Sequence, residues 1–258
     1  MTNTGRGRTA FVDLEFGYAY GTHRCISMPI EAGVVVYDHS EDRPIFGGWE
    51  CREDLEVEIW QNRTDALGRR TGVSTHVANP GRRKIMSPYD PRHRLKREGW
   101  RRARRSASAL FDELSGFMED LCRQERPTAF CFFARGLECR ALKQAGFDLS
   151  PYPCSDIQQD VGATLGLKDL ISLDRAACMI GFAHEGAAIR SHHHRYPVPP
   201  RFSPYIMPHR AVGDAARIFL LHREYSSDRG RFCRSAEAYA AACGNGGDHS
   251  ETSHRPSA

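Results

Sequence analysis

Several protein classes are excluded by what the sequence lacks. The 258 residues hold no run of 18 apolar residues, so no segment predicts a membrane-spanning helix. The first ten residues contain no apolar stretch of the secretory kind, and nine cysteines, an odd number, do not suit a disulfide framework. No C-x-x-C pair occurs, which argues against a ribbon-type zinc site. We therefore expect a cytoplasmic protein whose cysteines are reduced and mostly buried.

Lysine is also scarce, because only four of the 36 basic residues are lysine and the rest are arginine. Their distribution is more informative than the formal net charge of +4. Residues 82–105 contain eleven basic residues against two acidic ones. Such a block attracts polyanions and is expected to guide single-stranded nucleic acid, although a merely solvated charged segment explains it equally well.

The hydrophobic pattern predicts an α/β chain with a mixed sheet. Alternating or β-branched apolar runs predict strands, and apolar residues that recur every three to four positions predict helices. The expected strands are 10–16, 30–37, 45–51, 129–134 and 154–157, and the expected helices are about 103–124, 137–145, 172–180 and 209–225. Residues 62–99 have no clear period and predict an irregular loop, and the low-complexity tail after 243 predicts disorder.

Two carboxylates share one predicted strand. Asp13 and Glu15 are two positions apart, so the period of a strand places both on one face. Leu14 and Phe16 point the other way. Carboxylates on a core strand need a cation to neutralise them, and a divalent metal ion, which prefers hard oxygen ligands, is suited to the role. The alternative is a strand end that is open to water.

A histidine and an aspartate stand five positions apart in the segment PHRAVGDAARIFLL. Five residues turn an α-helix by about 500°, so the two side chains cannot share a helical face. We expect His209 in the loop or first turn and Asp214 inside the helix. The positive potential at a helix N-terminus favours the neutral, proton-accepting form of His209. The alternative is a solvated capping histidine beside a surface aspartate.

Taken together, these motifs resemble those of the DEDDh 3′–5′ exonucleases. VDLEF, IEAGVVVYD, a strand–helix unit with a central carboxylate, and HRAVGDA follow one another in the order of that family, over roughly residues 11–225. The family includes ribonuclease T, oligoribonuclease and the proofreading subunit of DNA polymerase III. The resemblance implies a ribonuclease H-like fold, a mixed five-stranded sheet flanked by helices, over residues 1–225. An irregular basic insertion is then expected at about 62–105, and a tail at 226–258.

The same resemblance implies a two-metal site. Asp13, Glu15, a middle aspartate and Asp214 would hold two divalent ions, Mg²⁺ or Mn²⁺, and His209 would act as the general base.

The chain departs from the family pattern in the middle motif. There, Glu138 stands where the family has an aspartate at the start of a helix, with the apolar Leu142 four positions later. Glutamate is longer by one methylene, and Mg²⁺ tolerates little geometric slack, so the site must shift Glu138, bridge through water or bind its second ion weakly. Asp156 is a substitute candidate, with a structural role on the fifth strand as the main alternative.

Weaker signals surround this site. Phe16 and Gly17 fall where family members contact the terminal nucleotide, although Phe16 is also explained as a core aromatic. Three consecutive histidines, 192–194, rarely converge on one metal ion, so segment 184–208 is expected to rim the site instead.

These patterns predict a metal-dependent 3′–5′ exonuclease that releases 5′-mononucleotides from the 3′ end of single-stranded RNA or DNA. The alternative is a catalytically weakened nucleic-acid-binding module on the same fold. A homodimer is compatible with either function, and a membrane partner is not expected.

Overall fold

A computed structural model of the chain describes residues 7–22, 24–51, 59–64, 70–75, 85–86 and 94–244. The strands among these residues are β1 (Arg8–Tyr20), β2 (Cys25–Asp38), β3 (Arg43–Glu50), β4 (Ile59–Thr64), β5 (Arg70–Thr75), β6 (Ile85–Met86), β7 (Ala129–Phe132), β8 (Cys154–Asp156), β9 (Ala183–Glu185), β10 (Ala188–Arg190) and β11 (Arg195–Pro197). The helices are α1 (Arg97–Glu125), α2 (Gly136–Gln144), α3 (Ile157–Thr164), α4 (Leu173–Met179), the 3₁₀ turn η2 (Ser203–Tyr205), α5 (Ala211–Ser227) and α6 (Arg229–Gly244).

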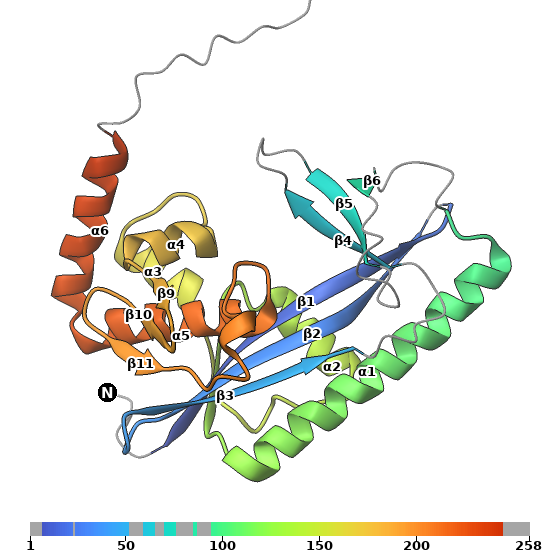
Figure 1. Ribbon diagram of the computed structural model, residues 1–258, viewed down its shortest axis with the longest axis horizontal. Helices are drawn as coiled ribbons and strands as arrows, with labels where there is room; N and C mark the ends of the chain where they lie inside the picture. Colours follow the sequence, from blue (N-terminus) through green and yellow to red (C-terminus); the bar gives the residue numbers. More distant parts are fainter. Residues whose placement is uncertain are drawn as a thin grey trace, which may run out of the picture.

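The central sheet is mixed. β1 pairs antiparallel with β2, which pairs antiparallel with β3, whereas β1 pairs parallel with β7 and β7 pairs parallel with β8. Five strands therefore lie in the order β3–β2–β1–β7–β8, and β4, β5 and β6 extend the sheet from β1 (Figure 1). β9, β10 and β11 form a separate small sheet. The expectation of an α/β protein with a mixed sheet flanked by helices is confirmed.

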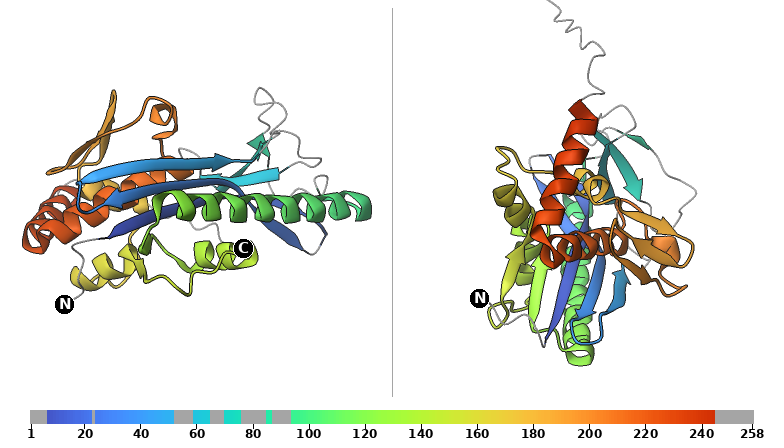
Figure 2. Two further views of the ribbon diagram at one scale, coloured as in Figure 1. Left: turned by 90° about the horizontal axis from the view of Figure 1, so that it is seen from below. Right: turned by 90° about the vertical axis from the view of Figure 1, so that its left-hand side faces the viewer.

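Different helices cover the two faces of the sheet (Figure 2). On one face, apolar residues of α1 and α2 pack against alternate residues of β1 and β2, among them Val12 and Val34. On the other face, α3, α4, α5 and α6 pack against the intervening residues, such as Phe11 and Val35. The alternation of both strands thus builds two apolar layers, because successive side chains point to opposite faces.

The region expected to be an irregular loop contains regular structure. β4, β5 and β6 form antiparallel pairs there, and α1 already begins at Arg97, so residues 97–105 belong to a helix. That expectation was wrong in these segments. The sequence did not predict these first turns because the residues that they bury, Gly99 and Ala103, are small and carry little hydrophobic signal.

The C-terminal part also has more structure than expected. Residues 229–244 of the predicted tail form helix α6, which buries Phe232 and Ala236, and α3 follows β8 directly. Both helices were missed, because few apolar residues mark their inner faces. The predicted disorder after 243 lies almost wholly outside the described residues.

Two further expectations concern the cysteines and membranes. Eight of the nine cysteines have described side chains and all eight are free, but only Cys51 and Cys131 of them are buried, so the expectation of mostly buried thiols was wrong. None of the described helices combines the length and the apolar character needed to cross a membrane.

Candidate active site

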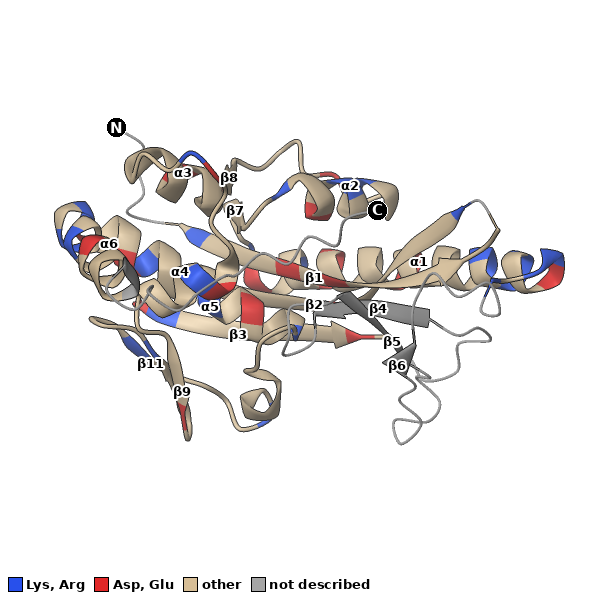
Figure 3. Cartoon of the chain, turned by 90° about the horizontal axis from the view of Figure 1, so that it is seen from above, with Lys and Arg blue, Asp and Glu red and all other residues tan. Residues whose placement is uncertain are grey.

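Strand β1 presents two carboxylates on the face that α5 covers. Asp13 and Glu15 are half-buried there, each opposite a residue of β2: Asp13 faces Gly33 and Glu15 faces Glu31. The predicted common face follows from the regular alternation of β1. Figure 3 shows acidic residues along this strand.

The start of α5 lies directly against β2. A Cβ atom on Gly33 would come within 2.0 Å of the carbonyl carbon of Ala211, so only glycine permits this contact. Beside it, the carboxylate of Glu31 accepts hydrogen bonds from Arg210 Nε (2.9 Å) and from the backbone N–H of Ala211 (3.3 Å). The E-x-G sequence of β2 therefore docks the N-terminus of α5 over the face that carries Asp13.

His209 and Asp214 meet in the way that the sequence predicts. Asp214 lies in the first turn of α5, and His209 precedes the helix with a left-handed backbone (φ +60°) and an exposed side chain. The backbone N–H of His209 donates to Asp214 Oδ2 at 3.1 Å, and this bond holds the residue in its unusual conformation. One ligand atom from each of Glu15, His209 and Asp214 lies within 4.8 Å of the other two.

The carboxylates of this group disturb one another. Burial, and then the negative charge of Asp214, raise the pKa of Asp13 well above its usual value, with further contributions from Glu15, Glu138 and Glu31. Burial also raises the pKa of Asp214 to about 6, although Arg217 and His209 oppose the shift. Such crowding of carboxylates is typical of sites that bind cations.

The buried Arg217 was not anticipated from the sequence. Its Nη1 contacts Asp214 Oδ1 at 3.0 Å and Asp174 Oδ1 at 2.9 Å, and its guanidinium lies 5.5 Å from the ring centre of Phe182. Arg217 is 8% exposed, so its charge is compensated by these carboxylates rather than by water. The three-residue spacing from Asp214 is the only sequence signal for this pair.

Glu138 lies in the first turn of α2 and is buried. Burial raises its pKa to about 7, and the charge of Asp156 adds to the shift. Its Oε2 atom is fully buried and has no hydrogen-bond partner among the described residues. The charge of Glu138 acts on Asp13, but neither of these two residues is among the three whose ligand atoms lie within 4.8 Å of one another.

Asp156, the substitute candidate, has a structural role. Its carboxylate accepts hydrogen bonds from four backbone N–H groups, those of Ala134, Arg135, Gln158 and Gln159. It thereby caps α3 and fixes the turn after β7, so its oxygens are engaged.

The remaining sequence candidates differ in position. Phe16 is 8% exposed and packs with the α1 cluster on the opposite face of the sheet, so the core alternative holds and it has no surface for stacking a base. Gly17 is buried on the same strand.

The histidine triplet does not converge on a metal ion. His193 Nδ1 and its backbone N–H bind Glu224, whereas His194 bonds to Ser227. The ring of His192 lies against Gly181.

No family model matches the chain, and no curated protein matches it either. The geometry of the carboxylates and His209 is therefore the ground on which a function is argued.

Proposed function

We propose that the protein is a metal-dependent 3′–5′ exonuclease acting on single-stranded RNA or DNA. The observation that carries this proposal is the meeting of Glu15, His209 and Asp214, from β1 and the start of α5, within 4.8 Å. Asp13 and Glu138 bring two further carboxylates whose charges act on one another. The strand order β3–β2–β1–β7–β8 supports the ribonuclease H-like fold that the motifs imply.

The residues present fit Mg²⁺ or Mn²⁺. The donors are carboxylate oxygens, which these hard cations prefer, and a bound cation would offset the mutual repulsion that raises the pKa of Asp13. The buried, unpartnered Oε2 of Glu138 is one such donor. Asp13, Glu15 and Asp214 would hold the ions together with Glu138.

Metal ions bound there would lower the pKa of a water molecule and stabilise the leaving 3′ oxygen of the scissile phosphodiester. His209 would accept the proton of that water, since its ring is exposed beside Glu15 and Asp214. Asp214 also orients His209 by accepting its backbone N–H. Each turnover would release one 5′-mononucleotide.

One observation favours the alternative, a non-catalytic nucleic-acid-binding module. Arg217 already neutralises Asp214, and a cation at this carboxylate weakens its attraction for a metal ion. A binding module, however, does not explain why His209 is exposed beside the carboxylates or why a carboxylate is buried at Glu138.

A nuclease assay separates these two functions. The protein is incubated with 5′-labelled single-stranded RNA or DNA and Mg²⁺ or Mn²⁺, beside a substrate blocked by a 3′-phosphate. We expect stepwise shortening from the 3′ end that stops with EDTA and in the Asp13→Ala variant. Tight binding without shortening in either metal would instead establish the binding module.

A further inference from the structure

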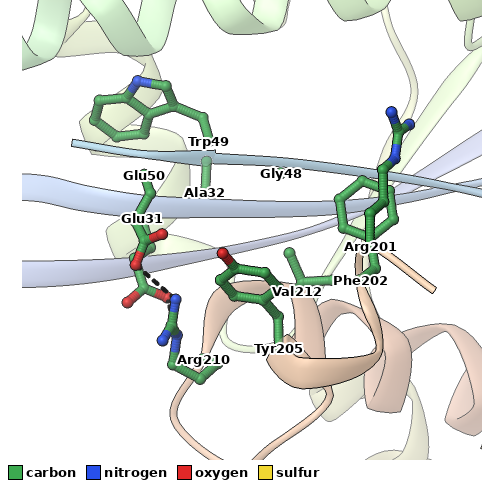
Figure 4. A pocket seen from close by; sticks show the side chains of 10 residues that line it. All are labelled: Glu31, Ala32, Gly48, Trp49, Glu50, Arg201, Phe202, Tyr205, Arg210 and Val212. Carbon is green, nitrogen blue, oxygen red and sulfur yellow. Dashed lines mark hydrogen bonds and ion pairs between the residues drawn. The ribbon is translucent and has the colours of Figure 1, made fainter. Parts of the chain in front are cut away.

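A cavity of about 220 Å³ lies beside the candidate active site, along β3, which is the outermost strand of the sheet among the described residues (Figure 4). We call it the edge cavity. Two aromatic residues and two arginines line it on the α5 side of β3, namely Phe202, Tyr205, Arg201 and Arg210. The ring of Trp49 points to the other side of the strand (Figure 4). A volume below the roughly 300–1,000 Å³ of drug-sized sites leaves room for one planar ring system rather than for a folded segment.

The backbone of β3 supplies polar groups at this edge. Cys51 N–H donates to the carbonyl of Ile30 on β2. Along an antiparallel strand, every second residue directs its backbone N–H and C=O groups at the neighbouring strand, so Trp49 and Gly47 do so as well. The N–H and C=O groups of Gly48 and Glu50 therefore face away from β2. Pro44, at an equivalent position, has no N–H to donate, which agrees with this direction. Gly48 lines the edge cavity with no side chain over its amide.

Charge in the edge cavity is arranged unevenly. Arg210 is paired with Glu31 (2.9 Å) and Glu50 (2.6 Å), and its guanidinium stacks on Tyr205 at 4.7 Å. Arg201 is exposed and lies 4.7 Å over Phe202, and in the described part of the chain it forms no ion pair. One cation is thus held in place at the cavity and is available to an anion.

The edge cavity and the carboxylate group share a wall. Glu31 lines the cavity and its charge also acts on Asp13, while Arg210 directly follows His209. A nucleic acid whose 3′ end lies at the carboxylates would therefore have the edge cavity beside it, across Glu31.

We propose that the edge cavity binds one nucleobase of the substrate strand, with Arg201 contacting the adjoining phosphate. The inference rests on the proposed function. Aromatic side chains stack bases of any sequence, and every base offers a neighbouring donor and acceptor to a backbone N–H and C=O. The site would therefore position the strand without selecting its sequence.

Binding is measured without metal ions, so that the carboxylates take no part. Adenosine 5′-monophosphate, adenosine, ribose 5-phosphate and inorganic phosphate are titrated in EDTA, with calorimetry and the emission of Trp49 as readouts. Calorimetry decides the result, because the indole N–H of Trp49 donates to Glu113 on α1 and the ring points away from Tyr205 and Phe202. The emission of Trp49 reports on other events at the edge of β3. We expect the two base-containing probes to bind and the other two not to bind.

Two variants test the parts of the site separately. Tyr205→Ala is expected to weaken binding of adenosine 5′-monophosphate roughly 5- to 100-fold, the usual cost of losing one stacking ring, whereas Tyr205→Phe keeps it. Arg201→Ala, an exposed change that leaves the fold intact, is expected to weaken the monophosphate about 2- to 5-fold and adenosine not at all. Equal binding of ribose 5-phosphate, or no binding of the nucleotide, overturns the proposal.

The outcome is separable from that of the nuclease assay. A protein that binds adenosine 5′-monophosphate through Tyr205 but shortens no substrate has the base site without the proposed activity. A protein that shortens its substrate, while Tyr205→Ala and Arg201→Ala change neither KM nor nucleotide binding, has the activity without the base site. Trp49 emission that changes with protein concentration, and not with nucleotide, would show that a second copy covers the edge, and this too contradicts the inference.

Discussion

The carboxylate of Asp13 lies in the field of four others, those of Glu15, Glu31, Glu138 and Asp214. Its pKa in the folded protein is raised above the unfolded value, so ionised Asp13 costs stability at neutral pH. That cost disappears as the pH falls below the unfolded pKa, because the group is then protonated in both states. A residue kept at such a cost is typical of a functional site rather than of a structural core.

Replacing Asp13 by Asn removes this cost. In EDTA at pH 7 the Asp13→Asn variant is expected to be more stable than the wild type, by about 0.5–2 kcal/mol, in a thermal melt. Adding Mg²⁺ should raise the melting temperature of the wild type and leave the variant nearly unchanged. Asp112→Asn, at an exposed carboxylate on α1, serves as the control and should alter neither value. A lower melting temperature for Asp13→Asn in EDTA would contradict the crowding of charge.

Glu138 provides a second test at the residue scale. Its pKa of about 7 means that metal binding near neutrality must displace a proton, so metal affinity should fall as the pH decreases from 8 to 6. Calorimetric titration with Mn²⁺ in buffers of different ionisation enthalpy measures this proton release. Glu138→Gln should reduce it, whereas protons held by Asp13 and Asp214 are still released.

The length of the same side chain is tested by Glu138→Asp. Because the DEDDh exonucleases that the motifs resemble have aspartate there, we expect the proposed nuclease activity to be equal to or above that of the wild type. A large loss would show that Glu138 is not the middle ligand.

At the scale of elements, the contact between β2 and α5 brings the start of α5 next to the carboxylates of β1. Gly33 admits the backbone of Ala211, and the Glu31–Arg210 ion pair closes the contact on the outer side. The position of His209 and Asp214 over β1 depends on this approach, because both residues belong to the start of α5.

Gly33→Ala is expected to be strongly destabilising. The added Cβ would meet backbone atoms at 2.0–2.2 Å, which cannot move aside like a side chain, so the loss should be about 3 kcal/mol or more in chemical denaturation. Gly47→Ala on β3 is the matched control, since its Cβ would meet only side-chain atoms, the nearest being Leu121 Cδ1 at 3.2 Å. Similar losses for both variants would contradict a special role for Gly33. Metal binding should also weaken in Gly33→Ala alone.

Over the whole molecule, the basic and acidic features lie on different layers. The arginine-rich start of α1 packs through Ala103 and Ala107 against Ile30 of β2, on the sheet face opposite the carboxylates. Figure 3 shows basic residues gathered at that end of the helix. Its exposed arginines, such as Arg101 and Arg104, therefore lie too far round the sheet to contact a phosphate bound at the proposed active site. Their expected part is to hold a longer strand electrostatically.

Salt dependence tests this division. Arg101→Gln/Arg104→Gln should bind a long single strand more weakly and reduce the slope of log K against log salt by about 1.4, or about 0.7 for each phosphate that the variant no longer neutralises. Hydrolysis of a dinucleotide, which is too short to reach α1, should not change. Filter binding at several salt concentrations measures the slope. An unchanged slope would show that α1 takes no part in binding.

The sequence determines the parts of this protein whose pattern is local. The period of two in β1 places Asp13 with Glu15 and sends Phe16 to the other face, and the five-residue spacing puts His209 before the helix that holds Asp214. Each of these relations depends on the geometry of a single strand or helix, so it can be predicted without knowing which other elements pack against it.

The tertiary structure decides what depends on contacts between distant segments. Nothing local shows that Arg217 pairs with Asp174, that Asp156 caps a turn 22 residues away, or that α6 is a helix rather than a tail. Burial and electrostatic shifts arise in the same way, since the pKa of Asp13 depends on residues from β2, α2 and α5. Local spacing fixes which face a side chain occupies, whereas packing fixes which charges and apolar surfaces meet it there.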